Sequence, residues 1–181
     1  MAEIKDAYVI EWMGPYKSID EMYDYEDTEF CSLYIITGRM KHQKSYGIKY
    51  IGITKRDPCN RLQDPDHIEK QKNIKDKEYW TGRFSVSSYN ILTKGVRRNR
   101  AELVEHLLVK YLNLKIGYKH FLNDKKTKAY PKKPVVIISR GLSPACDKDR
   151  YNKPSILKDL PDVLMYVDGE FFTSNKLKKD F

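Results

Sequence analysis

The sequence predicts an α+β fold in which a small, mainly antiparallel sheet is flanked by helices. Two apolar stretches, residues 31–38 and 49–54, alternate as strands do and lie close enough in the chain to form a hairpin. A short helix is expected to begin at Asp57 and Pro58, because aspartate caps a first turn and proline is tolerated within it. A longer helix is expected over about residues 99–112, where apolar residues recur at helical spacing.

The chain of 181 residues is long enough for one domain with a proper core and an appendage. We expect a strand–helix lead-in over residues 1–29, a core over residues 30–125 and a basic C-terminal extension over residues 126–181. Both terminal regions are therefore expected to be extensions of the central core.

Each terminal region has its own local signals. Residues 7–12 are expected to form a strand, residues 14–15 a turn, and residues 18–21 the capping box of a short helix. In the C-terminal extension, residues 135–138 and 163–172 are expected to form strands. No motif indicates a role for this extension.

The composition indicates a protein that meets a polyanion. The formal net charge is +9 and the sequence pI is about 9.3, which favours DNA, RNA or an anionic membrane surface as a partner. No apolar run approaches the roughly 20 residues of a membrane span, so a soluble, cytoplasmic protein without a membrane partner is expected. Cys31, Cys59 and Cys146 lack a C-x-x-C spacing and are expected to be free thiols.

Two tyrosines stand out in the predicted hairpin. Tyr34 and Tyr50 lie on the faces of their strands opposite to the aliphatic residues. If the strands are neighbours, both phenols share one surface beside Gly52, whose missing side chain lets a substrate backbone come close. The alternative is that both tyrosines are half-buried sheet residues, which is the commoner role of a strand tyrosine.

Four short motifs follow one another through the centre of the chain, and they are Ser32-Leu33-Tyr34, Tyr50-Ile51-Gly52, Arg61-Leu62 and Glu105 within the longer predicted helix. In this order they resemble the GIY-YIG nuclease family, which includes restriction enzymes, phage homing endonucleases and the incision nuclease of bacterial excision repair. The resemblance covers roughly residues 30–125. The second triplet matches the family motif in full, whereas Ser32 and Leu33 stand where the family usually has glycine and isoleucine.

This resemblance implies a metal-dependent DNA endonuclease whose products carry 5'-phosphate and 3'-hydroxyl ends. Glu105 would hold Mg²⁺ or Mn²⁺, and Tyr34 or Tyr50, with a lowered pKa, would act as general base. Arg61 would bind an oxygen of the scissile phosphate and offset the charge that develops as the bond breaks. A solvated surface position is the alternative for this arginine. Restriction-type or homing-type cutting is preferred over repair incision, because the chain lacks the additional domains of a repair enzyme.

A helical wheel separates the two glutamates of the longer helix. Glu105 lies about 20 degrees beyond Leu112, at the margin of the apolar stripe, where a carboxylate is partly desolvated yet reachable by substrate. Glu102 falls outside the stripe and is assigned a capping role with Asn99 as N-cap. The alternative for Glu105 is a border glutamate paired with lysine or arginine.

Three further residues are weaker candidates. His67 follows Arg61, and some restriction-type members of the family carry a histidine just after the arginine as a proton shuttle. Lys55 follows the second strand, where its charge would lower the pKa of a neighbouring phenol. Asn123 is the nearest candidate for an asparagine that family members place after the helix. Either a short insertion moves it into place or that role is lost.

Basic residues on both sides of the longer helix would bind double-stranded DNA. Each phosphate neutralised contributes about 0.9 to the log–log salt slope, and ordinary solubility charge is the alternative. The competing class is a non-catalytic nucleic-acid-binding protein on the same scaffold, and a homodimer remains one option for the oligomeric state. The basic residues assigned to DNA are Lys94, Arg97, Arg98, Arg100, Lys125 and Lys126.

Overall fold

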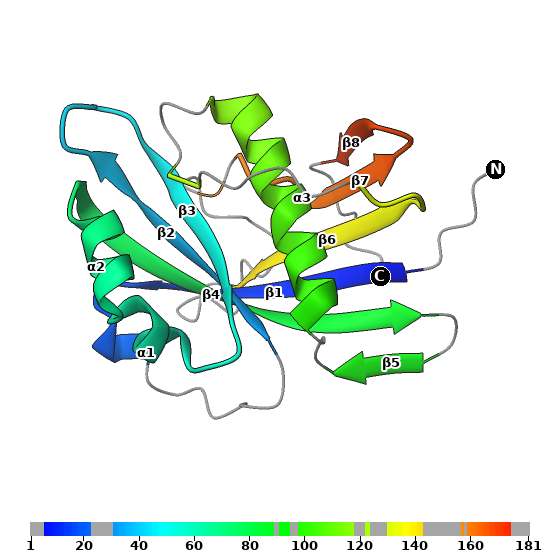
Figure 1. Ribbon diagram of the computed structural model, residues 1–181, viewed down its shortest axis with the longest axis horizontal. Coiled ribbons are helices and arrows are strands. Elements are labelled where there is room, and N and C mark those ends of the chain that lie inside the picture. Colours follow the sequence, from blue (N-terminus) through cyan, green and yellow to red (C-terminus); the bar gives the residue numbers. More distant parts are fainter. Residues whose placement is uncertain are drawn as a thin grey trace.

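The computed structural model describes residues 6–22, 31–88, 91–94, 98–117, 122–123, 130–142, 157 and 159–174. Within these residues the protein is α+β, with one large curled sheet and helices packed against it (Figure 1). The strands are β1 (Asp6–Tyr16), β2 (Ser32–Met40), β3 (Tyr46–Thr54), β4 (Ile74–Ser88), β5 (Ile91–Lys94), β6 (Val135–Leu142), β7 (Val163–Val167) and β8 (Glu170–Ser174). The helices are the 3-10 helix η1 (Asp20–Met22) and the α-helices α1 (Pro58–Leu62), α2 (Pro65–Gln71) and α3 (Arg98–Ile116).

The sheet is larger than the sequence predicted, and it is mixed. The strand order is β3-β2-β4-β1-β6-β7-β8, with β5 paired to β4. The described strand pairs are antiparallel except β1 with β6, where residues 6–13 run parallel to residues 135–142. The expected α+β class is therefore confirmed, but the expectation of a small sheet is wrong. This parallel pair joins strands more than 100 residues apart in the chain, and such a pairing leaves no local signal in the sequence.

The predicted turn at Gly14 and Pro15 is also wrong, because both residues lie inside β1. Pairing with β4 is interrupted after Met13 and resumes where Tyr16 faces Tyr79, so the strand is irregular there but does not end. Gly14 has a φ of +136°, and a Cβ at this position would lie 2.8 Å from the carbonyl oxygen of Tyr79. Glycine is thus required at this point of the strand.

The start of α1 is as predicted, but the start of α3 is not. Asp57 caps α1, since its Oδ1 accepts a hydrogen bond of 2.8 Å from the backbone N–H of Cys59. Helix α3 begins at Arg98, so Asn99 lies within the helix and cannot be its N-cap. Glu102 accepts a hydrogen bond of 2.8 Å from Nε of Arg98, one turn earlier, which replaces the expected capping role.

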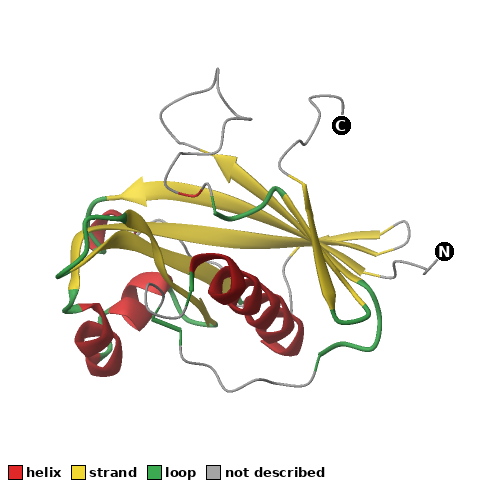
Figure 2. Ribbon diagram, turned by 90° about the horizontal axis from the view of Figure 1, so that it is seen from above, coloured by secondary structure: helices red, strands yellow, loops and turns green. Residues whose placement is uncertain are grey.

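Two apolar clusters divide the side chains of β2 and β3, as the alternation predicted. The larger cluster joins Leu33, Ile35 and Ile51 to the apolar stripe of α3. The smaller cluster holds Tyr34 and Tyr50 together with residues of α1. Helices α1 and α2 lie at the β2–β3 end of the sheet and β7 and β8 at the opposite end, with α3 between them (Figures 1 and 2). The tyrosine face is therefore covered by the two short helices.

Two smaller expectations concern the thiols and the membrane. Cys31 and Cys59 are buried free thiols, as predicted, whereas Cys146 lies outside the described residues. None of the described helices has both the length and the apolar character needed to cross a membrane.

Candidate active site

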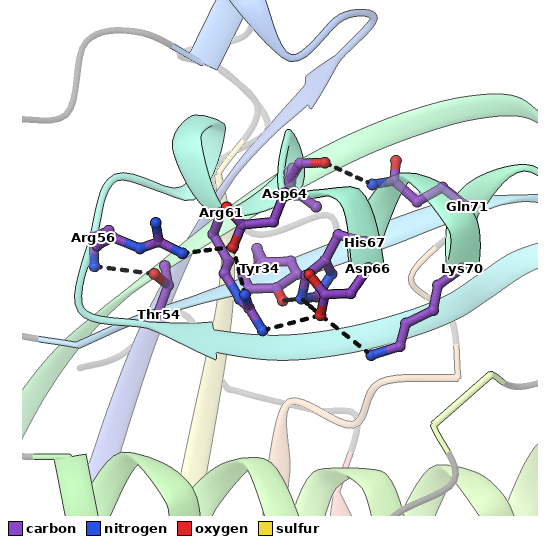
Figure 3. A network of polar contacts seen from close by, with 10 residues as sticks. Tyr34, Thr54, Arg56, Arg61, Asp64, Asp66, His67, Lys70 and Gln71 are labelled. Atoms are coloured by element: carbon purple, nitrogen blue, oxygen red, sulfur yellow. Dashed lines mark hydrogen bonds and ion pairs between the residues drawn. The ribbon is translucent and has the colours of Figure 1, made fainter.

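Three aromatic side chains form a buried cluster at β2, β3 and α2. The rings of Tyr34 and Tyr50 are stacked with their centroids 5.9 Å apart, and the ring of His67 lies edge-on to both, at 5.9 and 5.7 Å. The hydroxyl oxygen of Tyr34 is 3.4 Å from Nε2 of His67 (Figure 3). Tyr34 and His67 are each 1% exposed and Tyr50 is 9% exposed. The two tyrosines are neighbours, as predicted, but they are buried and do not form an open surface.

The hairpin register explains why Tyr34 has this position. Tyr34 faces Gly52 across the antiparallel β2–β3 pair. A Cβ added to Gly52 would lie 2.3 Å from both Cζ and Oη of Tyr34. The space left by the missing side chain is therefore filled by the Tyr34 phenol, and not by a substrate backbone as the sequence suggested.

Replacing Gly52 by alanine is expected to destabilise the protein, because the new methyl group and the Tyr34 ring cannot occupy the same space. Overpacking of this kind costs about 1–3 kcal/mol of the free energy of unfolding, which denaturant titration measures. Gly47→Ala is the matched control, since it lies in the same strand and a Cβ there would meet no atom within 4 Å. Equal stability of the two variants would contradict this account of Gly52.

The pKa values of both phenols are raised, which is opposite to the expected direction. Burial is the main cause for Tyr34 and for Tyr50, and the negative charge of Glu105 raises both pKa values further. The positive charge of Arg61 lowers both, but by less than burial raises them. Neither phenol is therefore ionised at neutral pH in the free protein. The sequence could not indicate this, because it does not show how deeply the rings are enclosed.

Arg61 reaches this cluster from α1. Its guanidinium donates a 2.5 Å hydrogen bond to Asp64 and lies 3.6 Å from a carboxylate oxygen of Asp66 (Figure 3). Both acidic residues were missed in the sequence, although they follow Arg61 by three and five positions. The Asp64 hydrogen bond contributes to raising the pKa of Arg61, and the same contact lowers the pKa of Asp64. The arginine is thus held in place at the rim, with its side chain 31% exposed.

Glu105 reaches the cluster from α3. It is 2% exposed, so it is more enclosed than a position at the margin of the apolar stripe implied. A helical wheel considers only the residues of α3 and not the strands that pack against it. In the structure the Glu105 carboxylate is close enough to Tyr34 and Tyr50 to raise the pKa of both. The two phenols therefore lie within electrostatic range of both the Arg61 guanidinium and the Glu105 carboxylate.

His67 is more central than the sequence indicated. Asp64 and Pro65 interrupt the helical pattern, but the interruption is the start of a second helix, with Asp64 as N-cap and Pro65 in the first turn. This new helix carries His67 between the two tyrosines. Burial lowers the pKa of His67, and the charge of Arg61 lowers it further, so the imidazole is neutral at pH 7. Its Nδ1 has no hydrogen-bond partner among the described residues.

Asn123 lies beside the middle residue of the second triplet. Its Oδ1 accepts a 2.8 Å hydrogen bond from the N–H of Ile51, and its Nδ2 donates a 2.5 Å hydrogen bond to the carbonyl of Ile51. The neighbouring Leu122 N–H donates to the carbonyl of Lys49 at 2.7 Å. The side chain of Asn123 thus pairs with the free edge of β3 as another strand would, next to Tyr50.

Replacing Asn123 by alanine is expected to leave the N–H and C=O groups of Ile51 without their partners. Each buried polar group that loses its partner costs about 1–3 kcal/mol of the free energy of unfolding. Asn113→Ala is the matched control, because Asn113 is also buried but its Oδ1 has no hydrogen-bond partner among the described residues. Chemical denaturation of both variants tests this, and a smaller loss for Asn123→Ala than for Asn113→Ala would refute the role in β3.

The remaining candidates lie away from the phenols or outside the described residues. Lys55 lines a pocket beside Arg61 and is not among the main charges that act on the pKa of Tyr34 or Tyr50. Arg98 and Arg100 are exposed at the start of α3, and Lys94 ends β5. Arg97, Lys125 and Lys126 are outside the described residues.

No family model, curated protein sequence or solved structure matches this chain. The likeness to GIY-YIG nucleases therefore remains a resemblance carried by four motifs. The function has to be inferred from the chemistry of the groups that the fold brings together.

Proposed function

We propose that the protein is a divalent-metal-dependent nuclease that hydrolyses phosphodiester bonds in DNA. The observation that supports this most strongly is the convergence of five side chains from β2, β3, α1, α2 and α3, which are Tyr34, Tyr50, Arg61, His67 and Glu105. Together they offer hydroxyl groups, a neutral base, a cation and an anion, which are the groups that phosphodiester hydrolysis requires.

Within this class we propose an endonuclease of the GIY-YIG type, with a GIY-YIG core formed around β2, β3 and α3. The reason is that the residues of the motifs are the same residues that meet in space. Products with 5'-phosphate and 3'-hydroxyl ends, and restriction-type or homing-type cutting, follow from this assignment. The net charge of +9 and the exposed Arg98 and Arg100 favour double-stranded DNA as substrate.

Arg61 is the residue that would bind the scissile phosphate. Its guanidinium carries more donors than its contacts with Asp64 and Asp66 use, so a non-bridging phosphate oxygen can be bound without breaking both contacts. Asp66 lies 3.6 Å from Arg61 and 3.8 Å from Nε2 of His67, so a phosphate bound by Arg61 would lie near the contact between His67 and Tyr34. Charge that develops on the phosphate in the transition state would be stabilised by this cation.

Proton removal from the attacking water would run through Tyr34 to His67. The raised pKa of Tyr34 excludes a resting phenolate, so the hydroxyl passes a proton on and does not store negative charge. His67 is neutral, and its Nε2 lies 3.4 Å from the Tyr34 hydroxyl, so it can accept that proton. The lowered pKa of His67 keeps it available as a base at neutral pH.

Glu105 is the residue that would hold Mg²⁺ or Mn²⁺. Among the described residues there is no group of three or more histidine, cysteine, aspartate or glutamate side chains that forms a metal site. One carboxylate still fits Mg²⁺, which keeps several water ligands and binds substrate phosphate oxygens. When bound, the ion would polarise the phosphate and stabilise the departing 3' oxygen. Metal binding is therefore expected to be weak without DNA.

A second candidate function is DNA binding without cleavage. The near-complete burial of Tyr34 and Glu105, together with Ser32 and Leu33 in the first triplet, favours a scaffold that has kept its fold but closed its site. Incubation of supercoiled plasmid with the protein separates the two functions. The nuclease proposal requires nicked or linear DNA with Mg²⁺ or Mn²⁺ and none with EDTA. Binding of the plasmid without cutting under both conditions would favour the second candidate.

A further inference from the structure

A basic pocket of about 330 Å³ adjoins the aromatic cluster. Four cationic side chains line it, Lys55, Arg56, Arg61 and Arg98. They come from the chain after β3, from α1 and from the start of α3, so the fold brings together charges that are separated in the sequence. Arg61 is shared, because it lines this pocket and also acts on Tyr34.

The cations of the pocket are only partly neutralised. Arg56 and Arg61 both donate to the same carboxylate oxygen of Asp64 (Figure 3), and Arg98 donates to Glu102. Lys55, in contrast, forms no ion pair with any described residue and is exposed. Asp66 lies 3.6 Å from Arg61 as well, so Lys55 is the pocket cation whose charge no described carboxylate pairs with.

Three of the four cations, Lys55, Arg61 and Arg98, act electrostatically on each other or on the pocket wall. Arg61 repels the charge of Arg98, which opposes the rise in the pKa of Arg98 caused by Glu102. Lys55 and Arg98 both oppose the rise that burial produces in the pKa of the Cys31 thiol, which lines the same pocket. Like charges held around one space are stabilised by an anion that enters it.

We propose that this pocket holds a second backbone phosphate of the DNA strand, adjacent to the phosphate that Arg61 presents to Tyr34 and Tyr50. The inference rests on the proposed nuclease function and adds to it a binding site for a second phosphate of the substrate strand. Because Arg61 forms a wall common to both places, two phosphates bound there belong to neighbouring nucleotides of one strand. Lys55 then binds phosphate and does not activate a phenol.

Salt dependence of DNA binding tests the pocket without requiring cleavage. Affinity for a fluorescently labelled DNA duplex is measured in EDTA over a range of salt concentrations, for the wild type and for Lys55→Gln and Arg98→Gln. Loss of one phosphate contact is expected to reduce the magnitude of the log–log slope by about 0.9 in each variant. Both side chains are exposed, and thermal unfolding verifies that the variants are folded.

Lys115→Gln is the matched control. Lys115 is an exposed lysine near the other end of α3, about 25 Å along the helix from Arg98, and its removal changes the net charge equally. The slope of this variant is expected to equal that of the wild type. If all three variants change the slope alike, or if Lys55→Gln and Arg98→Gln leave it unchanged, the pocket does not hold a phosphate.

Cleavage adds a readout that separates this inference from the nuclease proposal. Lys55→Gln is expected to lower kcat/KM for a DNA duplex severalfold but to leave that for bis(p-nitrophenyl) phosphate unchanged, since the small diester has no second phosphate. Equal losses on both substrates would overturn the pocket. If the wild type cuts neither substrate, the nuclease proposal fails, while a reduced salt slope in Lys55→Gln would still support the phosphate pocket.

Discussion

Glu105→Gln is expected to abolish plasmid cleavage while DNA binding is retained. The substitution keeps the size of the side chain but removes the charge that would hold the metal ion. A bound divalent ion supplies several kcal/mol of transition-state stabilisation, so the cleavage rate is expected to fall by at least about 10³-fold. Initial rates of plasmid nicking at saturating Mg²⁺ and Mn²⁺ measure the loss.

Glu105→Gln also has an expected spectroscopic signature. The Glu105 carboxylate raises the pKa of Tyr34 and of Tyr50, so its removal is expected to lower both. Alkaline titration followed by NMR of ring-labelled tyrosine resolves Tyr50, the more exposed of the two phenols, from the other tyrosines and measures its shift. The titration reports the proximity of the three groups whether or not the protein cuts DNA.

Glu102→Gln provides the comparison for Glu105→Gln. Glu102 lies one turn from the start of α3, is 27% exposed and pairs with Arg98, so its carboxylate is not part of the phenol cluster. Its replacement removes the partner of Arg98 but leaves Glu105 in place, so DNA binding is expected to strengthen, while the cleavage rate at saturating DNA and the tyrosine titration are expected to match those of the wild type. Cleavage by Glu105→Gln at the wild-type rate would rule out a metal-binding role for this glutamate.

The tyrosine pair was predictable because it depends on local periodicity. Side chains alternate along a strand, so periodicity alone places Tyr34 and Tyr50 opposite the aliphatic residues, and they share one face once the two strands pair. Their burial was not predictable, because it results from α1 and from His67 of α2, which cover that face. Burial then decides the direction of the phenol pKa values, and this changes the expected chemistry from a resting phenolate to a proton relay.

His67 and Asn123 illustrate two different limits of the sequence. For His67 the signal was present but ambiguous, since Asp64 and Pro65 are as typical of a helix start as of an interruption. For Asn123 no local signal exists, because its partner Ile51 lies 72 positions earlier in the chain. The parallel pairing of β1 with β6 could not be predicted for the same reason. Its partners lie far apart in the chain, and a pattern confined to one segment cannot indicate such contacts.

Tyr34→Phe is expected to lower the cleavage rate by about 10² to 10⁴-fold, the range that general acid–base groups contribute. The ring and its stacking with Tyr50 are retained, and only the hydroxyl that lies 3.4 Å from His67 is removed. The hydroxyl also interacts with that of Tyr50, so its loss is expected to cost about 1 kcal/mol of the free energy of unfolding. Single-turnover cleavage and denaturant titration of the same preparation give the two quantities.

Tyr79→Phe makes the same chemical change elsewhere in the smaller apolar cluster. The Tyr79 hydroxyl donates a 3.1 Å hydrogen bond to Gln71, away from the phenol pair, so its loss is expected to cost about 1 kcal/mol of stability and no activity. The two variants should therefore lose similar amounts of stability, and only Tyr34→Phe should lose cleavage. If Tyr34→Phe cuts DNA as fast as Tyr79→Phe, the proton does not pass through Tyr34, and His67 must contact the attacking water directly or have no catalytic role.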